Sequence, residues 1–459
     1  MFNLILSSLA LIRSYNLMSR NTINHNQGTI LACLLIMLSS VIIAQPTDNS
    51  PLSRVGFGEP QDVHFVSSYA MGGLGAAYKH LHQANIKNPA SLAYLEATAF
   101  EVGLYAKRST LKREPFKSTV WSGNLDYLSL SFPVLNPINE LLERRERDFS
   151  WGLNVSLTPF SRVGYAITSE DIFDSIGVVS RSFQGTGGLY RFNVGNGWRY
   201  KDLSVGLNLG YVFGRTSYST ETVFDDVPGD YQHIARSDIS YRGFVWSTGL
   251  QYDIRLKPSS ENNKRFITIG AFYNAGSSFD TERDYINYVL NLAYSDADTA
   301  IYEVEQPGTG KFASEFGFGA IIQESNAWSV GIDYSQQAWN EYRNDARPET
   351  LSDTWRLAGG VTFTPDFSSI SSYFSRVEYR AGVFYQADPR NLEGQQAYRY
   401  GVTLGAGLPF VFLRSFSYVN IGLEYGRTGT ESALKENYLR GRIGIVLNDN
   451  QWFLKRRYN

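Results

Sequence analysis

The sequence predicts an all-β fold, a transmembrane antiparallel β-barrel of about 14 strands, an even number as bacterial single-chain barrels require. Three observations carry this prediction. From about Ala99 onward, apolar and polar residues alternate in one short segment after another. Aromatic residues make up 14% of the 459 residues, and 41 glycines stand beside 15 prolines. Long apolar runs, which a helical membrane protein needs, occur only within residues 1–44.

Residues 1–44 have the features of a signal peptide that export removes. The apolar run ILACLLIMLSSVII is followed by Ala44, a small residue suited to cleavage. Either Met1 or Met18 starts the chain. The rival interpretation is a permanent membrane anchor, for which a run of about 15 apolar residues is short. Cys33 lies in this run, so the mature chain has no cysteine for disulfide bonds or thiolate chemistry.

The barrel strands are predicted from period-two alternation. In LSVGLNLGYVFG, residues 203–214, the leucine, valine and aromatic side chains point to one face, and serine, asparagine and glycine point to the other. A soluble β-sandwich also alternates, but large aromatic residues near strand ends favour a membrane barrel with interfacial girdles. The expected strands begin near Ala99, Asn124, Phe149, Arg181, Leu203, Ser237, Arg265, Lys311, Ala327, Ser352, Ser375, Gln396, Ser415 and Asn437.

The links between the expected strands differ in length. Short links such as YKDL and ESNAW suit the periplasmic side. The long polar stretches Thr220–Arg236 and Ser278–Thr309 are expected to be extracellular loops. One link on the short side, Leu135–Asp148, has helical spacing and mixed charge. We expect a solvated periplasmic helix there, with a partner-binding element as the alternative.

Charged residues are nearly balanced, and many are predicted to face the lumen. Loss of the leader, whose charges are Arg13 and Arg20, leaves 40 of the 42 basic residues against 44 acidic ones. This balance, without basic blocks, argues against nucleic-acid binding. The mixed signs suit either a salt-bridged interior or a polar substrate path. By alternation, the lumen-facing charged residues are Glu101, Arg191, Arg199, Asp253, Glu315, Asp333, Arg356, Glu378, Arg380, Arg399, Glu424, Arg440 and Arg442.

The sequence does not predict an enzyme, a metal site or a bound cofactor. The histidines after the leader are His64, His80, His82 and His233, and none lies within an expected barrel strand. A serine–histidine hydrolase needs both groups within hydrogen-bond reach on a firm scaffold. His80 and His82 lack the third ligand that a metal site needs. The sequence also contains no phosphate-binding loop.

The segment Gln45–Leu95 precedes the alternation and carries short motifs. It contains MGGLGAAY from Met71 and NPASL from Asn88. Followed by about 14 alternating strands, these motifs resemble the FadL/TodX family of outer-membrane transporters for hydrophobic compounds. SPLSRVGFGEP, from Ser50, and the final NDNQWFLKRRYN resemble the Bacteroidetes branch of that family. Over the barrel, the match is one of topology and strand spacing.

The resemblance implies a hatch and a route for the ligand. In that family, the segment before the first strand plugs the lumen, and the ligand leaves sideways through a gap in the wall near a kink in the third strand. Mapped here, residues 45–95 form the hatch and residues 96–459 form the barrel. Basic hatch residues Arg54, Lys79 and Lys87 would contact a ligand carboxylate or pair equally well with lumen acids. The implied hatch or gate residues are Met71, Gly72, Gly73, Gly75, Asn88, Pro89 and Ala90.

A proline gives a physical reason for a kink in the third strand. Thr158, Pro159 and Phe160 lie within the expected strand that begins at Phe149. Because proline cannot donate to the strand ladder, it requires a bulge, a kink or a strand edge. We therefore place the lateral opening at these three residues. The alternative is a plain turn at Thr158–Arg162, which would make the number of strands odd.

These observations give three hypotheses for the function. The first is a monomeric outer-membrane channel, surrounded by outer-membrane lipid, that takes up hydrophobic small molecules such as long-chain fatty acids. The second is an accessory or structural barrel subunit of a protein-secretion or surface-attachment complex, with a secretion-machinery protein as its partner. The third, a general aqueous porin, is disfavoured because a hatch would occlude the pore.

Overall fold

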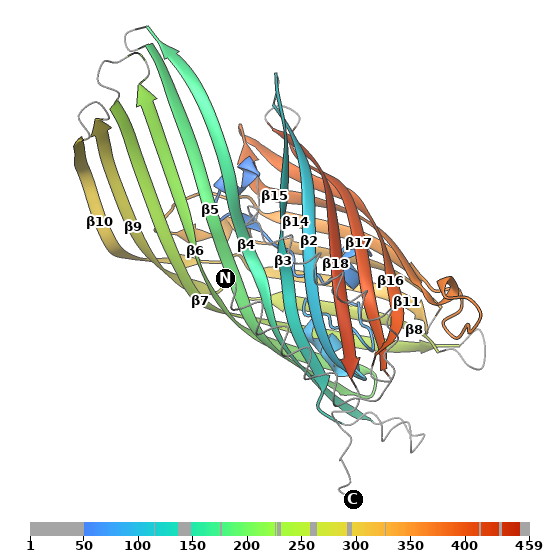
Figure 1. Cartoon of the computed structure of the whole chain (residues 1–459). Helices are drawn as coiled ribbons and strands as arrows, with labels where there is room; N and C mark the ends of the chain where they lie inside the picture. The colour runs from blue at the N-terminus through green and yellow to red at the C-terminus, as the bar shows by residue number, and fades with distance from the viewer. Residues whose placement is uncertain are drawn as a thin grey trace, which may run out of the picture. The chain divides into compact units, whose positions relative to one another are not determined.

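The computed structural model describes most of the chain after residue 49 (Figure 1). The described residues are 50–459 except 114, 136–147, 175–176, 225, 227–230, 258–263, 292–295, 326, 413–414, 431–433 and 450–459. The predicted signal peptide, residues 45–49 of the predicted hatch and most of the predicted Leu135–Asp148 helix lie outside these ranges.

The described chain forms a closed antiparallel β-barrel. Neighbouring strands pair along the wall, and β18 (Lys435–Asp449) pairs with β2 (Thr98–Arg113) to close it. Closure matters in a membrane because an open sheet edge would leave backbone groups without partners in lipid. The other strands of the wall are β3 (Phe116–Pro133), β4 (Phe149–Phe173), β5 (Gly177–Tyr200), β6 (Leu203–Phe224), β7 (Tyr231–Leu256), β8 (Arg265–Asn274), β9 (Ser278–Asn291), β10 (Asp296–Lys311), β11 (Glu315–Glu324), β12 (Trp328–Gln337), β13 (Arg343–Asn344), β14 (Thr354–Phe363), β15 (Glu378–Leu392), β16 (Gln395–Phe412) and β17 (Ser415–Gly429).

The wall is a 14-stranded barrel, which confirms the predicted number and the all-β class. Some barrel strands consist of two pieces. The lower piece β8 and the upper piece β9 both pair with β7, and β11 pairs with β8 below the point where β10 pairs with β9. Interruptions at residues 275–277 and 312–314 separate the pieces. The plain-turn alternative at Thr158–Arg162 is wrong, because β4 runs through these residues as one strand.

The predicted loops Thr220–Arg236 and Ser278–Thr309 are largely strand, so this prediction is wrong. β6 continues to Phe224, β7 begins at Tyr231, and β9 and β10 occupy most of the second stretch. These segments mix serine, threonine and charged residues on both faces, so they lack the apolar face by which a lipid-facing strand is recognised. Figure 1 shows β5, β6, β7, β9 and β10 extending upward together on one side of the barrel. We call the upper parts of β4–β7, β9 and β10 the tall sheet.

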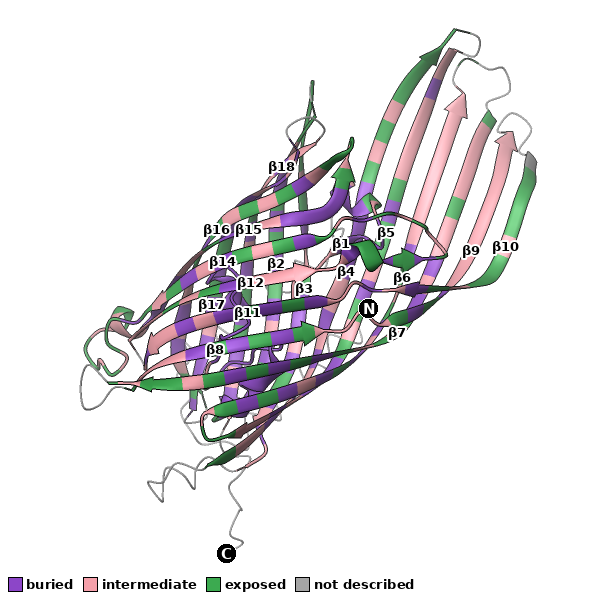
Figure 2. Ribbon diagram, turned by 180° about the vertical axis from the view of Figure 1, so that it is seen from behind, coloured by how far each residue is buried: buried purple, intermediate pink, exposed green. Residues whose placement is uncertain are grey.

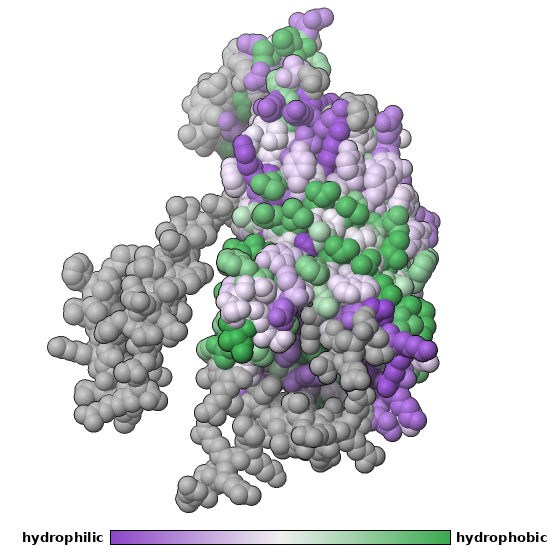
Figure 3. All heavy atoms as spheres, turned by 90° about the vertical axis from the view of Figure 1, so that its right-hand side faces the viewer, coloured by the Kyte–Doolittle hydropathy of each residue, from purple (hydrophilic) through white to green (hydrophobic). Residues whose placement is uncertain are grey.

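The two faces of the wall differ as the alternation predicts. In β6, Val205 and Leu209 are exposed, whereas Ser204 and Asn208 are buried. Buried and exposed bands alternate along many strands in Figure 2. Figure 3 shows apolar side chains gathered across the middle of one face and hydrophilic ones above them, as expected of a wall in contact with lipid. In the described ranges, no helix is both long and apolar enough to span a membrane.

Residues 50–95, which we call the hatch, pack inside the barrel. They contain η1 (Pro51–Arg54), β1 (Glu59–Pro60), α3 (Val66–Tyr69) and η2 (Pro89–Tyr94). The helix η2 contacts β4, β5, β6 and β7, whereas α3 contacts β16, β17 and β18. Most residues between Val63 and Leu95 are buried. The hatch therefore reaches across the lumen from one side of the wall to the other.

Candidate functional site

The Asn88-Pro89-Ala90 triplet forms a turn that starts η2. The Asn88 side-chain oxygen accepts a hydrogen bond from the Ala90 N–H at 3.1 Å, which caps the helix. Proline suits the first helical position because no N–H is needed there. The Asn88 side-chain nitrogen donates to the Ala76 carbonyl at 2.5 Å and to the Leu250 carbonyl of β7 at 3.2 Å. The turn therefore ties two parts of the hatch to the wall.

The glycines of the MGGLG motif allow the hatch backbone to touch the wall. Gly72 and Gly73 have φ angles of 72° and 75°, which residues with a side chain rarely adopt. A Cβ atom on Gly360 of β14 would lie 2.2 Å from the Met71 carbonyl oxygen. A Cβ atom on Gly382 of β15 would lie 2.1 Å from the Gly72 nitrogen. Glycine on both surfaces is needed for this close contact.

Charged wall residues hold the hatch by its backbone. The Asp333 carboxylate of β12 accepts hydrogen bonds from the Gly75 and Ala76 N–H groups at 2.5 and 2.8 Å. On another side, the Arg442 guanidinium of β18 donates to the His64 carbonyl at 3.0 Å. A hydrogen bond to a charged group contributes about 1.5–3 kcal/mol. The middle of the hatch is therefore firmly fixed in the lumen.

The three basic hatch residues have different surroundings. Lys79 forms an ion pair with Asp253 of β7, and burial lowers the Lys79 pKa to about 8 despite that carboxylate. Lys87 pairs with Glu315 of β11 at 2.6 Å. Arg54 is exposed. The two lysines thus pair with lumen acids, as one of the two alternatives expected. Contact between any of the three basic residues and a ligand carboxylate stays a prediction.

Backbone pairing between β3 and β4 stops part of the way up the wall. The last paired residues are Leu128 of β3 and Leu157 of β4, and the two strands diverge above them (Figure 1). The register of β4 against β5 then shifts between Pro159 and Ser161. A proline without an N–H and an extra residue, Phe160, account for this bulge. We call the unpaired boundary between the upper parts of β3 and β4 the seam.

The first part of the hatch lies along the seam. Its strand β1 pairs with β4, with Glu59 opposite Arg162 and Pro60 opposite Ser161. The backbone edge that β4 would otherwise offer to β3 is therefore partly covered by the hatch. The residues of the predicted lateral opening, Thr158–Phe160, lie at the start of this edge. That a ligand leaves the barrel here stays a prediction.

Arg162 connects three elements across the seam. Its guanidinium donates to Asp126 of β3 at 3.1 Å and to Gln61 of the hatch at 2.8 Å. It also lies 4.0 Å from the centroid of the Tyr105 ring of β2. Asp126 forms a second ion pair with Arg442 at 3.3 Å. Side-chain charges thus hold this boundary where backbone hydrogen bonds between the two strands are missing.

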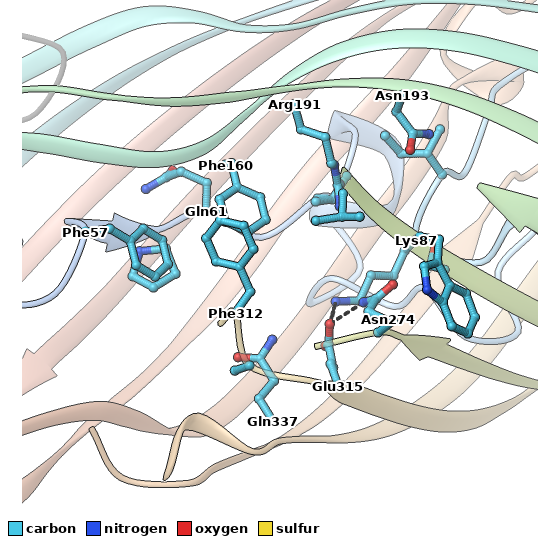
Figure 4. A pocket seen from close by; sticks show the side chains of 18 of the residues that line it. Phe57, Gln61, Lys87, Phe160, Arg191, Asn193, Asn274, Phe312, Glu315 and Gln337 are labelled. Carbon is cyan, nitrogen blue, oxygen red and sulfur yellow. Dashed lines mark hydrogen bonds and ion pairs between the residues drawn. The ribbon is translucent and has the colours of Figure 1, made fainter. Parts of the chain in front are cut away.

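A cavity of about 100 Å³ lies in the lumen beside the bulge of β4 (Figure 4). Five aromatic side chains line it, one of them Trp246 of β7. The other four rings contact one another in pairs with centroids 4.8–5.9 Å apart. The rings come from the hatch, from the bulge, from the break between β10 and β11, and from η3 (Trp339–Glu341). Phe57, Phe160, Phe312 and Trp339 supply these rings, and we call them the aromatic cluster.

Polar groups line the rest of the cavity. The Glu315 carboxylate accepts two hydrogen bonds from Lys87, at 2.6 and 2.8 Å, and one from Asn274 at 2.6 Å. Arg191 of β5 reaches into the cavity from the side facing Glu315 (Figure 4). Within the described residues, Arg191 has no hydrogen-bond or ion-pair partner, and its Nε atom is buried.

Sequence reasoning found only part of this cavity. Alternation placed Arg191 and Glu315 in the lumen, and both do line the cavity there. The aromatic cluster was missed because Phe57, Phe312 and Trp339 follow interruptions in the strand rhythm, where alternation gives no direction. Of the predicted site residues, Lys87 and Phe160 meet at the cavity. The MGGLG motif, Asn88-Pro89-Ala90, Arg54 and Lys79 lie elsewhere in the hatch.

His80 is the hatch histidine whose ring contacts both a carboxylate and the backbone. Its Nε2 lies 3.3 Å from a Glu378 carboxylate oxygen, and its Nδ1 accepts a hydrogen bond from the His82 backbone N–H at 3.1 Å. In the part of the chain that the structure describes, no group of three or more His, Cys, Asp or Glu side chains is placed to hold a metal ion.

The closed wall, its apolar outer face and its filled lumen define a class, the plugged β-barrels of the outer-membrane type. A model of the BamG family matches residues 27–459. The chain therefore belongs to the BamG family. No curated protein matches it.

Solved structures with a similar fold include three transport proteins or their homologues. The Pseudomonas putida toluene transporter TodX has a TM-score of 0.54 and 16% identity, over 85% of this chain and 99% of that one. For the Ralstonia pickettii toluene transporter TbuX, the TM-score is 0.51 and the identity 14%, over 84% and 98%. A Pseudomonas aeruginosa FadL homologue has a TM-score of 0.50 and 13% identity, over 85% and 98%. The resemblance inferred from the sequence is confirmed as a likeness of fold.

Proposed function

We propose that this protein is a monomeric outer-membrane channel for hydrophobic small molecules, long-chain fatty acids or similar compounds. The hatch gates the channel, and the molecule leaves sideways through the seam. The seam is the observation that carries this proposal, because β4 parts from β3 after Leu157 and no wall strand has to separate from another there. A molecule that dissolves in lipid needs no aqueous exit. The fold shared with TodX and TbuX, both named as toluene transporters, supports this function.

Opening the seam requires movement of the first part of the hatch and separation of the Arg162–Asp126 ion pair between β4 and β3. Release of β1 from β4 breaks a short antiparallel pairing at Glu59 and Pro60. It also breaks hydrogen bonds that join Ser50 to Gly164 and Phe57 to Ser161. Each bond contributes about 0.5–1.5 kcal/mol, and the step leaves the paired strands of the barrel intact. The fixings at Asn88 and Asp333 lie further along the hatch and can stay in place. A gate of this kind moves one end of the hatch and leaves the other anchored.

Uptake into liposomes tests the transport function. The full-length protein is reconstituted in liposomes that contain lipopolysaccharide, and entry of a fluorescent long-chain fatty acid is compared with entry into protein-free liposomes. We expect the protein to add saturable uptake, and a variant without residues 45–95 to change its rate. If the full-length protein adds nothing to the rate of protein-free liposomes, transport of this class of molecule is not its function.

The tall sheet favours a second candidate function, an accessory or structural subunit of a secretion or surface-attachment complex. Its strands extend upward together on one side of the barrel (Figures 1 and 2). Within it, β10 pairs with β9 along one edge, whereas β13 covers only Gly310 and Lys311 of the other. An unpaired strand edge is a template for another chain. Absence of uptake, together with stoichiometric co-purification of secretion components from native membranes, would favour this function over the first.

A further inference from the structure

Arg191 differs from other arginines of the lumen in lacking a partner. Arg399 donates to the Glu424 carboxylate at 2.9 Å, and Arg380 donates to the Asn420 side chain at 2.8 Å. No described residue accepts a hydrogen bond from Arg191, although its Nε atom is buried. Burying the Nε–H group without supplying an acceptor is costly, whereas the rest of this half-buried side chain faces the cavity. An acceptor from outside the chain would relieve that cost.

The charges that line the cavity have a positive excess. Lys87, Arg191 and Glu315 are the charged residues of its lining. The single acid is already engaged, because Lys87 and Asn274 give its carboxylate three hydrogen bonds of 2.6–2.8 Å. An anion bound next to Arg191 would balance the second cation. A carboxylate fits best, because its two oxygens match the fork of N–H donors on a guanidinium.

The aromatic cluster indicates the rest of the ligand. Phe160 and Phe312 meet edge to face with centroids 4.8 Å apart, and Phe57 stacks on Phe160 at 5.7 Å. Such rings prefer a further aromatic ring, in an edge-to-face or offset-stacked arrangement. An apolar cavity of about 150 Å³ can hold benzene. This cavity, at about 100 Å³, is smaller, so a single ring would fill it and move some of its lining side chains.

We propose that the cavity binds a small aromatic carboxylate, with the carboxylate on Arg191 and the ring against the aromatic cluster. Figure 4 shows this juxtaposition, with Arg191 pointing into the space beside Phe160 and Phe312. The inference rests on the proposed uptake function in taking the cavity as part of the ligand's path. It makes the preferred ligand an anion, in contrast to the neutral toluene named for TodX and TbuX.

Calorimetric titration of the detergent-solubilised full-length protein with benzoate tests this site. We expect saturable binding of benzoate and a loss of affinity of about ten- to a hundredfold in Arg191→Met, the range expected for a charged hydrogen-bonded pair. Toluene has the same ring without the carboxylate and should bind the two proteins alike. Arg191→Lys, which keeps the charge but not the fork, should recover part of the lost affinity.

Two further variants serve as controls. Arg215→Gln removes an exposed arginine of β6 and should leave benzoate affinity unchanged. Phe312→Leu alters the aromatic cluster and should weaken both benzoate and toluene. Equal benzoate affinity in the original protein and Arg191→Met overturns the proposal. So does an absence of benzoate binding, or binding of laurate that depends on Arg191 while benzoate does not bind.

Binding and uptake are measured separately, so the two proposals can fail separately. If benzoate binding depends on Arg191 but the protein adds no uptake to liposomes, the proposed transport function is rejected and the proposed binding site is retained. If neutral compounds are taken up but Arg191→Met does not weaken benzoate binding, the proposed binding site is rejected and the transport function is retained.

Discussion

The buried side-chain amide of Asn88 bonds to other hatch residues and also to the barrel wall. Its hydrogen bonds reach Ala90, Ala76, Leu250 and Ala271, and the residue is fully buried. We expect Asn88→Ala to destabilise the packed hatch by about 2–4 kcal/mol, because these four bonds are lost and their partners stay buried. Trypsin should then cleave the hatch faster in the folded barrel. Asn340→Ala, at an exposed position, should leave cleavage unchanged, and equal rates in both variants would contradict the role of Asn88.

The glycines of β14 offer a matched pair of variants. A Cβ atom on Gly360 would lie 2.2 Å from the Met71 carbonyl oxygen, whereas a Cβ atom on Gly359 would lie 3.8 Å from its nearest neighbour, the Gly331 carbonyl oxygen. Gly360→Ala should therefore displace the hatch at a cost of about 1–3 kcal/mol, as overpacking does. Gly359→Ala should be neutral. Hydrogen exchange of the Met71 to Gly75 amides measures the effect, and identical protection in the two variants would argue against close packing.

At the residue scale, the sequence predicted which face of the wall a side chain occupies better than it predicted the groups to which that side chain bonds. Period two places residues i and i+2 on one face, which was enough to direct Asp333, Arg442 and Arg191 into the lumen. It does not show at what level along the barrel a wall residue lies, or which hatch residue lies beside it. The bond from the Gly75 N–H to Asp333 and the isolation of Arg191 therefore emerge only from the structure.

Among the elements, the seam depends on one acid of β3. Asp126 is buried and accepts Arg162 at 3.1 Å and Arg442 at 3.3 Å. We expect Asp126→Asn to cost about 3–5 kcal/mol, because it leaves two buried guanidinium groups uncompensated. The measurement is cysteine labelling at position 60 in Pro60→Cys, where the Asn variant should react faster with a polar maleimide.

Asp171→Asn is the control for that prediction. Its ion pair with Arg181 is exposed, and exposed pairs contribute about 0–1 kcal/mol. Labelling at position 60 should be the same with and without this control substitution. Equal labelling with and without Asp126→Asn would show that the charges do not hold the seam.

At the element scale, prediction depended on whether a strand meets lipid. Strands with an apolar outer face were predicted well. The predicted first residue of β6, Leu203, is the one that the structure shows. The tall sheet was missed because its strands carry polar and charged residues on both faces and do not alternate apolar with polar. Pro159 correctly marked an irregularity in β4, since the missing N–H is a property of the residue itself.

For the whole molecule, closure, strand number and a hatch inside the lumen could be predicted, but the cavity beside the hatch could not. Alternation and the number of segments determine a membrane barrel. The cavity depends on side chains from the hatch, two strand interruptions and a bulge, which converge only in three dimensions. The central proposal is therefore that the first part of the hatch closes a seam through which molecules leave the barrel.

A disulfide bond between the hatch and β4, beside the seam, tests this claim most directly. Pro60 and Ser161 are opposite each other in the β1–β4 pair, and the neighbouring Gln61 N–H already donates to the Phe160 carbonyl. Pro60→Cys with Ser161→Cys would lock the hatch onto β4. Cys33, the single native cysteine, lies in the predicted signal peptide. As a control, Thr110→Cys with Thr119→Cys bridges β2 and β3 where they are paired.

The measurement is uptake of the fluorescent fatty acid into proteoliposomes before and after reduction. The account predicts that the oxidised seam variant adds no uptake, that reduction restores it, and that the control bridge transports in both states. Equal uptake by the oxidised and reduced seam variant would contradict the account.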